Sequence, residues 1–199
     1  MNTVKISESS KTILRIDDIS MNISQNRLDE LLERVRMKYP DLEFLLAVSP
    51  AVFEMTTSDD SDISERIFPS ILNAYSDHRV FYQVEKIGIP NWIYEIAQKY
   101  NARLASHGLI HVDHRLLDYS AQEMSIITST SLIGSKIFVP PFNKYNNETS
   151  EICSENNIEL IKWEDGWKHL SYQDFSNDGS RYYMHLHDFP GDKLANLFK

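Results

Sequence analysis

Four short apolar segments of this chain each run into residues that carry catalytic or metal-binding chemistry. β-Branched and apolar residues in such short runs predict strands. The segments are residues 11–16, 102–106, 136–139 and 182–186, and they lead into Asp17-Asp18, His107, Pro140-Pro141 and His187-Asp188. In a barrel of parallel strands the carboxyl ends all lie on one face. We therefore expect these acids and imidazoles to gather at one end of an α/β fold.

Helical patterns alternate with these strands. Apolar residues at positions 28, 31, 32 and 35 form one stripe of a helix that Ser24 opens and that ends before Pro40. Further helices are expected over 91–100, 120–133 and 147–156, the second with a capping box from Ser120 to Glu123 and a stop at Gly134. Further strands are expected over 43–48 and 158–163. This alternation favours a parallel, barrel-like sheet over a sandwich.

The stretch from 49 to 90 breaks this rhythm. We expect an acidic loop over 58–62, a helix over 64–75 that Pro69 interrupts, and a short strand over 80–83.

Length and composition narrow the class of protein. With 199 residues the chain has room for one substantial core, so a single domain over 1–199 is expected. A net charge of −9 without a basic cluster argues against nucleic acid as a partner. Cys153, the sole cysteine, is expected to be a small core residue, as in a reducing compartment. With no signal peptide or membrane-spanning segment in the sequence, we expect a cytoplasmic protein.

The segment from Ser106 to His111 holds two imidazoles, and Asp17-Asp18 adds two carboxylates. A catalytic divalent-metal site needs about three protein ligands and an open position. His107 and His111 are four residues apart, so on a helical turn both rings project from one face. Two alternatives stay open: an aspartate that caps the following helix, and a hydrogen-bonded histidine pair at a strand end. His114 is expected to be a solvated helix residue, with a supporting role behind the ligands as the alternative.

Five segments resemble, in order, the motifs of the NodB-type polysaccharide deacetylases, carbohydrate esterase family 4. They are Ile16-Asp17-Asp18, the His-x-x-x-His pattern from His107 to His111, Phe138-Val139-Pro140-Pro141-Phe142, Trp163-Glu164-Asp165-Gly166-Trp167 and Met184-His185-Leu186-His187. The chain is most similar to the divergent WbmS-like branch. This resemblance implies a distorted, incomplete (β/α) barrel of mostly parallel strands.

The resemblance also implies a role for each motif. A divalent metal, Zn²⁺ or else Co²⁺ or Ni²⁺, would be bound by Asp18, His107 and His111. Asp17 would be the catalytic base and His187 the general acid, with His185 as its competitor and Asp165 holding the ring of the acid. The residues lining the substrate site would be Pro141, Phe142, Asn143 and Trp167. Ordinary roles remain open for two of them, Trp167 as a core aromatic and Pro141 as a turn residue.

Two positions depart from the family pattern. Val139 stands where the family has an arginine that orients the base, and Ile19 stands where a glycine usually follows the paired aspartates. Because a valine side chain cannot donate a hydrogen bond, Arg15 or Asn143 would have to take over that role.

These features predict a metal-dependent deacetylase that removes an acetyl group, preferably an N-acetyl group, from a sugar. The partner would be an acetylated sugar, a sugar nucleotide or a lipid-linked glycan, as in the biosynthesis of surface polysaccharide or O-antigen. Two other functions remain open. One is a non-catalytic carbohydrate-binding relative, which Val139 suggests, and the other is a metallohydrolase that acts on a different ester.

Overall fold

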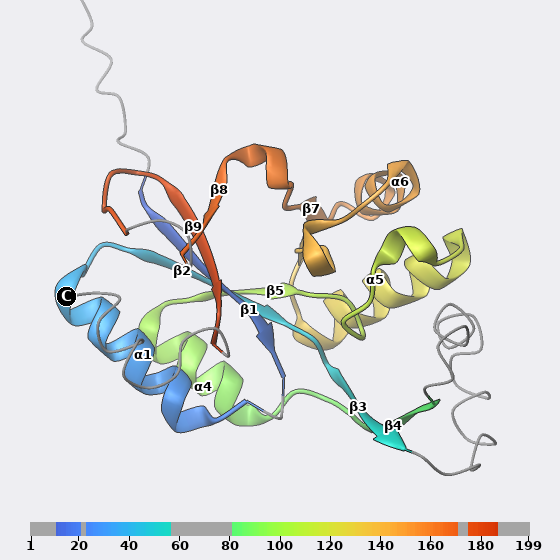
Figure 1. Ribbon diagram of the computed structural model, residues 1–199, viewed down its shortest axis with the longest axis horizontal. Coiled ribbons are helices and arrows are strands. Elements are labelled where there is room, and N and C mark those ends of the chain that lie inside the picture. Colours follow the sequence, from blue (N-terminus) through green and yellow to red (C-terminus); the bar gives the residue numbers. More distant parts are fainter. Residues whose placement is uncertain (1–10, 21–22, 57–80, 171–174, 187–199) are drawn as a thin grey trace, which may run out of the picture.

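A computed structural model describes residues 11–20, 23–56, 81–170 and 175–186 (Figure 1). Seven of its strands form one sheet in the order β7-β6-β5-β2-β1-β9-β8, and every neighbouring pair is parallel. These strands are β1 (Ile13–Ile19), β2 (Glu43–Val48), β5 (Arg103–Ser106), β6 (Ile137–Phe138), β7 (Glu159–Leu160), β8 (Trp167–His169) and β9 (Arg181–His185). The sheet curls into a half-barrel, which confirms the predicted α/β fold with an incomplete barrel.

Four long helices lie against this sheet in the described part of the chain. They are α1 (Gln25–Lys38), α4 (Asn91–Tyr100), α5 (Tyr119–Ile133) and α6 (Asn147–Glu155). The helices α1 and α4 lie side by side on one face, whereas α5 and α6 pack together next to β5, β6 and β7 (Figure 1). A separate pair of antiparallel strands consists of β3 (Ala51–Thr56) and β4 (Phe81–Ile87). None of the helices in the described ranges is long and apolar enough to cross a membrane.

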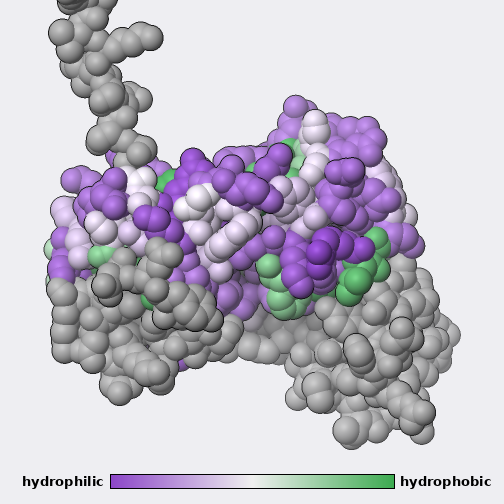
Figure 2. All heavy atoms as spheres, turned by 45° about the horizontal axis from the view of Figure 1, so that its top comes forward, coloured by the Kyte–Doolittle hydropathy of each residue, from purple (hydrophilic) through white to green (hydrophobic). Residues whose placement is uncertain are grey.

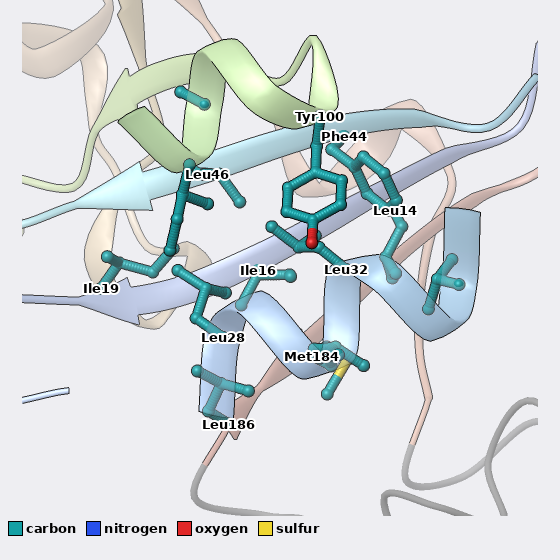
Figure 3. Close-up of a cluster of buried hydrophobic side chains, with 14 of the residues drawn as sticks. Leu14, Ile16, Ile19, Leu28, Leu32, Phe44, Leu46, Tyr100, Met184 and Leu186 are labelled. Carbon is teal, nitrogen blue, oxygen red and sulfur yellow. The ribbon is translucent and has the colours of Figure 1, made fainter. Parts of the chain in front are cut away.

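The two faces of the half-barrel follow from alternation along each strand. On β1, Leu14 and Ile16 point outward to α1 and α4, where they join the large core that Figure 3 shows. Side chains of the opposite parity point inward. The inner apolar cluster consists of Leu45, Ala47, Ala105, Val139, Ile161, Trp167 and Tyr183. Because Arg15 and Asp17 have this inward parity, β1 delivers two charged side chains into the concave side of the sheet.

Most of the predicted elements lie where the sequence placed them, and a few differ. The Ser24 side chain accepts a hydrogen bond from the Arg27 N–H at the start of α1, as expected. The strand expected over 158–163 is shorter, because the chain turns at Trp163 and enters β8, an unpredicted strand. The acidic loop over 58–62 and the helix over 64–75 lie outside the described residues.

The surface agrees with the charged composition of the chain. Figure 2 shows a mainly hydrophilic face with scattered apolar side chains.

Cys153 is buried between α5, α6 and the sheet together with Ile126 and Phe138, and burial raises the pKa of its thiol to about 12. A thiol with so high a pKa stays protonated at neutral pH, so Cys153 is the core residue that the sequence predicted.

The start of α5 corrects one prediction. The helix begins at Tyr119, and its N-cap is Asp118, whose side chain accepts the Ala121 N–H at 2.8 Å. The expected cap, Ser120, is an exposed residue inside the first turn. The aspartate takes the position because it precedes the helix in an extended conformation, as a cap must.

We predict that Asp118→Ala lowers the free energy of unfolding by about 1 kcal/mol, since the Ala121 N–H then loses its acceptor. Ser120→Ala is the matched control, and it should change stability by less than about 0.5 kcal/mol because alanine is a good helix former. Urea unfolding of the two variants measures the difference. Equal losses would contradict the assignment of the cap.

Candidate metal and active site

A bulge at the end of β1 directs both aspartates to the inner face. Between Ile16 and Ile19 the pairing with β2 advances by three residues on β1 but only two on β2. Asp18 has a φ of 60°, the left-handed conformation that is uncommon for a residue other than glycine. Asp17 therefore stays opposite His185 of β9, while Asp18 also turns inward. Two adjacent residues of a regular strand point to opposite sides, but here the bulge re-aims the second aspartate.

The three residues predicted to bind a metal come together. The Asp18 Oδ1 atom lies 3.2 Å from His107 Nε2 and 3.0 Å from His111 Nε2. One ligand atom from each residue lies within 4.8 Å of the other two. The His107 imidazole is buried, whereas the His111 imidazole and the Asp18 carboxylate are partly exposed. One side of the cluster is therefore open to solvent. This donor set, two imidazoles and one carboxylate, is the kind that holds a catalytic zinc-like ion.

Hydrogen bonding fixes the tautomer of the buried ligand. His107 Nδ1 donates to the Val139 carbonyl oxygen at 2.8 Å, because a carbonyl can only accept. In the neutral ring Nε2 then carries a lone pair, and that lone pair faces the Asp18 carboxylate. A metal ion or a proton between the two atoms would satisfy both of them. Burial alone would raise the pKa of Asp18, but His107 and His111 together lower the pKa well below its ordinary value. The carboxylate is therefore ionised, as a metal ligand must be.

The second aspartate is held by Arg15. Arg15 Nη2 donates to Asp17 Oδ2 at 2.8 Å and to Asn143 Oδ1 at 2.7 Å, and both charged side chains are almost completely buried. The guanidinium carbon lies 4.6 Å from the ring centre of Trp167 and 4.8 Å from that of Tyr183. An arginine on β1 itself thus lies beside Asp17, whereas position 139 carries a valine. Both substitutes that the sequence suggested, Arg15 and Asn143, take part.

The structure places the other predicted substrate-site residues around this centre. Phe142 is exposed, and its ring centre lies 4.4 Å from that of His111. Phe142 and Asn143 have φ values of 58° and 55°, an uncommon left-handed pair that turns the loop back toward Arg15. Pro141 and Trp167 are buried. Trp167 therefore packs against Arg15 inside the half-barrel as a core aromatic.

Strand β9 brings one imidazole, that of His185, close to the cluster of Asp18, His107 and His111. Its Nε2 lies 3.9 Å from Asp18 Oδ2, and its Nδ1 lies 3.4 Å from His169 Nε2 of β8. His187, the predicted general acid, lies outside the described residues, so that assignment stays a prediction. His169 carried no motif in the sequence. It belongs to a three-residue strand, so no periodic signal could have identified it.

Asp165 is not brought to the cluster. Its carboxylate accepts the Lys162 N–H and lies 3.9 Å from Arg181, the first residue of β9. His185 is the last residue of that strand. The two residues are four positions apart along the strand, a distance of about 13 Å. In the described residues it is His169 that lies beside His185.

Two expectations about the histidine segment were wrong. The chain from Gly108 to Val112 forms a bend and no helix, so His107 and His111 meet because the loop folds back, their ring centres 5.0 Å apart. His114 is not a solvated residue. It is completely buried, with Nδ1 donating to the Val112 carbonyl and Nε2 3.0 Å from Ser125 Oγ.

Solved structures of carbohydrate esterase family 4 proteins match the chain along most of its length. A family 4 esterase from Streptomyces lividans in complex with acetate is 14% identical, with a TM-score of 0.52 over 94% of this chain and 84% of that one. The peptidoglycan deacetylase PdaC from Bacillus subtilis is 10% identical, with a TM-score of 0.57 over 96% of this chain and 81% of that one. The chain has the carbohydrate esterase family 4 fold.

A pseudoenzyme of the same family, from Bacillus anthracis, is 11% identical, with a TM-score of 0.53 over 90% of this chain and 56% of its own. This chain spans 56% to 61% of the length of that pseudoenzyme and two mutants of it. No protein-family model matches the sequence, and no curated protein is significantly similar to it. At such identities the match concerns the fold, and similarity to the WbmS-like branch stays a prediction.

We predict that the purified chain binds one divalent metal ion and that His107→Ala abolishes stoichiometric binding, because the buried ring supplies a fixed lone pair. His169→Ala is the control, since that ring lies beside His185 and is not one of the three predicted ligands. Elemental analysis after dialysis measures the metal content. Equal metal content in wild type and His107→Ala would remove this site.

We also predict an effect of pH on stability from His114, whose pKa burial lowers from 6.5 to about 4. The unfolded chain binds a proton below about pH 6.5 while the folded chain does not, so stability is lost as the pH falls from 6.5 to about 4. His114→Gln lacks this group, and between pH 7 and 4.5 it should lose about 2 to 3 kcal/mol less than wild type. Urea unfolding with a chelator present tests the difference, because the other groups titrate in both proteins.

Proposed function

We propose that this chain is a metal-dependent deacetylase that removes an acetyl group, preferably an N-acetyl group, from a sugar. The observation that carries the proposal is the arrangement of the two aspartates. Asp18 faces two histidines at metal-ligand positions, and Asp17, directly beside it, is held by a buried arginine. One carboxylate thus has the surroundings of a ligand, and the other those of an oriented base.

The bound metal would be held by Asp18, His107 and His111, and it would supply polarisation of the acetyl carbonyl and acidification of a water molecule. Asp17 takes the proton of the attacking water on its Oδ1, because Oδ2 is occupied by Arg15. The Oδ1 atom is buried and makes no hydrogen bond to any described residue. The carboxylate thus presents one fixed oxygen to the reaction.

Protonation of the leaving group requires an acid on the other side of the acetyl group. His187 remains the proposed donor, since it follows the end of β9 and matches the family motif. His185 is the alternative on the same strand, and its position near Asp18 supports it. Single replacement of each histidine by glutamine separates the two, because only loss of the true donor should lower the rate for a poor leaving group such as an amine.

The proposed substrates are acetylated sugars, and in particular a sugar nucleotide or a lipid-linked glycan used for surface polysaccharide or O-antigen. The exposed Phe142 ring beside His111 supports a sugar ligand, because aromatic faces pack well against the apolar side of a pyranose. The solved neighbours act on carbohydrates, among them peptidoglycan. The direct experiment measures acetate release from a panel of N-acetylated sugars and sugar nucleotides with added Zn²⁺, Co²⁺ or Ni²⁺.

Two aspartate variants test the division of roles. Asp17→Asn should retain the metal and lose a factor of about 10² to 10⁴ in acetate release, because the general base is gone. Asp18→Asn should lose metal affinity. An Asp17→Asn protein as active as wild type would refute the mechanism. If wild type binds acetylated sugars in calorimetry but releases no acetate with any added metal, the alternative function is favoured, a non-catalytic carbohydrate-binding relative.

Arg15 can be tested through stability. In Arg15→Met the buried Asp17 carboxylate loses its counter-charge, which we expect to cost about 3 to 5 kcal/mol of unfolding free energy. The double variant Arg15→Met/Asp17→Asn removes both charges and should recover most of that loss. Asn143→Ala keeps the ion pair but loosens Arg15, so it should lower the rate by about tenfold or more with the metal retained. Additive losses in the double variant would show that the two side chains are not coupled.

A further inference from the structure

The loop that joins the two histidine ligands is fastened from behind by serine hydroxyls. Its backbone N–H groups at positions 108 and 109 have no carbonyl partner in a helix or strand. Gly108 N–H donates to Ser106 Oγ at 3.2 Å, and Leu109 N–H donates to Ser125 Oγ at 3.1 Å. Both serines are completely buried, Ser106 on β5 and Ser125 on α5. The loop is therefore held by side chains from two different elements.

The direction of each hydrogen bond in this network is determined. His114 Nδ1 faces the Val112 carbonyl at 3.1 Å and must donate to it, so Nε2 of the neutral ring is an acceptor. Burial lowers the pKa of His114 to about 4, which keeps the ring neutral. The Ser125 hydroxyl then donates to Nε2 at 3.0 Å and accepts the Leu109 N–H. One hydroxyl thus joins the ligand loop to the His114 ring.

A second chain of hydroxyls runs in parallel. Ser129 Oγ donates to the Ser125 carbonyl oxygen at 2.5 Å, so its hydrogen is used. Ser106 Oγ, 2.5 Å away, must therefore donate to Ser129 Oγ, and it accepts the Gly108 N–H with a lone pair. All members are buried and each donor has an acceptor. Such a fully satisfied network is rigid, because any rearrangement leaves a buried polar group unpaired.

Close packing at Gly108 further restricts the conformation of the loop. Gly108 has a φ of 79°, and a Cβ atom there would lie 2.8 Å from His114 Cε1 and 2.8 Å from the Ile110 carbonyl oxygen. The His114 ring thus lies directly against the backbone between the two ligands. His107 is bound independently to Val139, so this network acts on the part of the loop that leads to His111.

We propose that Ser125 and His114 are positioning residues for the metal site, and that they hold the His111 loop in its ligating shape before a metal binds. The inference rests on the proposed metal site but not on any reaction there. Rigid support behind a ligand raises metal affinity because less conformational freedom is lost on binding, and loss of such support commonly costs 10- to 100-fold in affinity.

The test compares two buried hydroxyls of the same helix. Ser125→Ala should weaken the affinity for Zn²⁺ by about 10- to 100-fold in competition calorimetry. Thr130→Ala is the matched control, since its hydroxyl donates to the Ile126 carbonyl of its own helix and contacts no part of the loop. It should leave the Zn²⁺ affinity within about twofold of wild type, on the same reasoning. A Ser125→Ala protein that binds Zn²⁺ like wild type would overturn the inference while leaving the proposed function intact.

Two variants of His114 keep the inference testable if Ser125→Ala does not fold. In His114→Gln the amide oxygen can accept from Ser125 in place of Nε2, so Zn²⁺ affinity should stay close to that of wild type, whereas His114→Leu should weaken it. The visible spectrum of bound Co²⁺ should change in the leucine variant alone. Equal Zn²⁺ affinity in the two His114 variants would overturn the inference, and a wild-type chain that binds no Zn²⁺ would overturn the proposed function as well.

Discussion

The ion pair between Arg15 and Asp17 is the interaction on which the rest of the site depends. Burying two charges is costly, and the cost is met only when the partners are close and the geometry is fixed. Here they lie 2.8 Å apart, with Trp167 and Tyr183 on the guanidinium and Asn143 as a second acceptor. The pair therefore fixes the Asp17 carboxylate, the loop that carries Asn143 and the packing of the inner face at once.

This pair also explains the valine at position 139. The concave side of the sheet carries small residues, Ala47 and Ala105, next to Val139. Arg15 reaches into this space from the central strand. A second arginine at position 139 would bring another buried cation to a carboxylate that already has one. The positive charge beside Asp17 thus comes from β1, and Val139 contributes its backbone carbonyl to His107.

The sequence predicted the parts of this structure that depend on local pattern. Strand alternation and helix periodicity placed β1, β2, α1 and α4, and the strand ends identified Asp18, His107 and His111. The missed features depend on contacts between distant residues. The bulge at Asp18 appears in the pairing of β1 with β2, and the sequence at that position does not indicate it, since a glycine would be the usual signal.

Histidines were the hardest residues to interpret from the sequence. The sequence around His111, His114 and His169 does not distinguish their roles. His111 lies at the Asp18 carboxylate, His114 is buried against Gly108, and His169 lies beside His185. What separates them is the course of the loop after β5 and the short strand β8. Neither has a periodic pattern, so tertiary contacts alone assign the roles.

The central claim is that Asp18 is a metal ligand while the adjacent Asp17, paired with Arg15, is not. The most direct test is a crystal structure of the zinc-loaded protein, with the metal located by its anomalous scattering. The account predicts one zinc ion about 2.0 to 2.2 Å from His107 Nε2, His111 Nε2 and an Asp18 carboxylate oxygen, with the Arg15–Asp17 pair retained. Zinc bound directly by Asp17, with Arg15 displaced from it, or zinc bound elsewhere on the chain, would contradict the account.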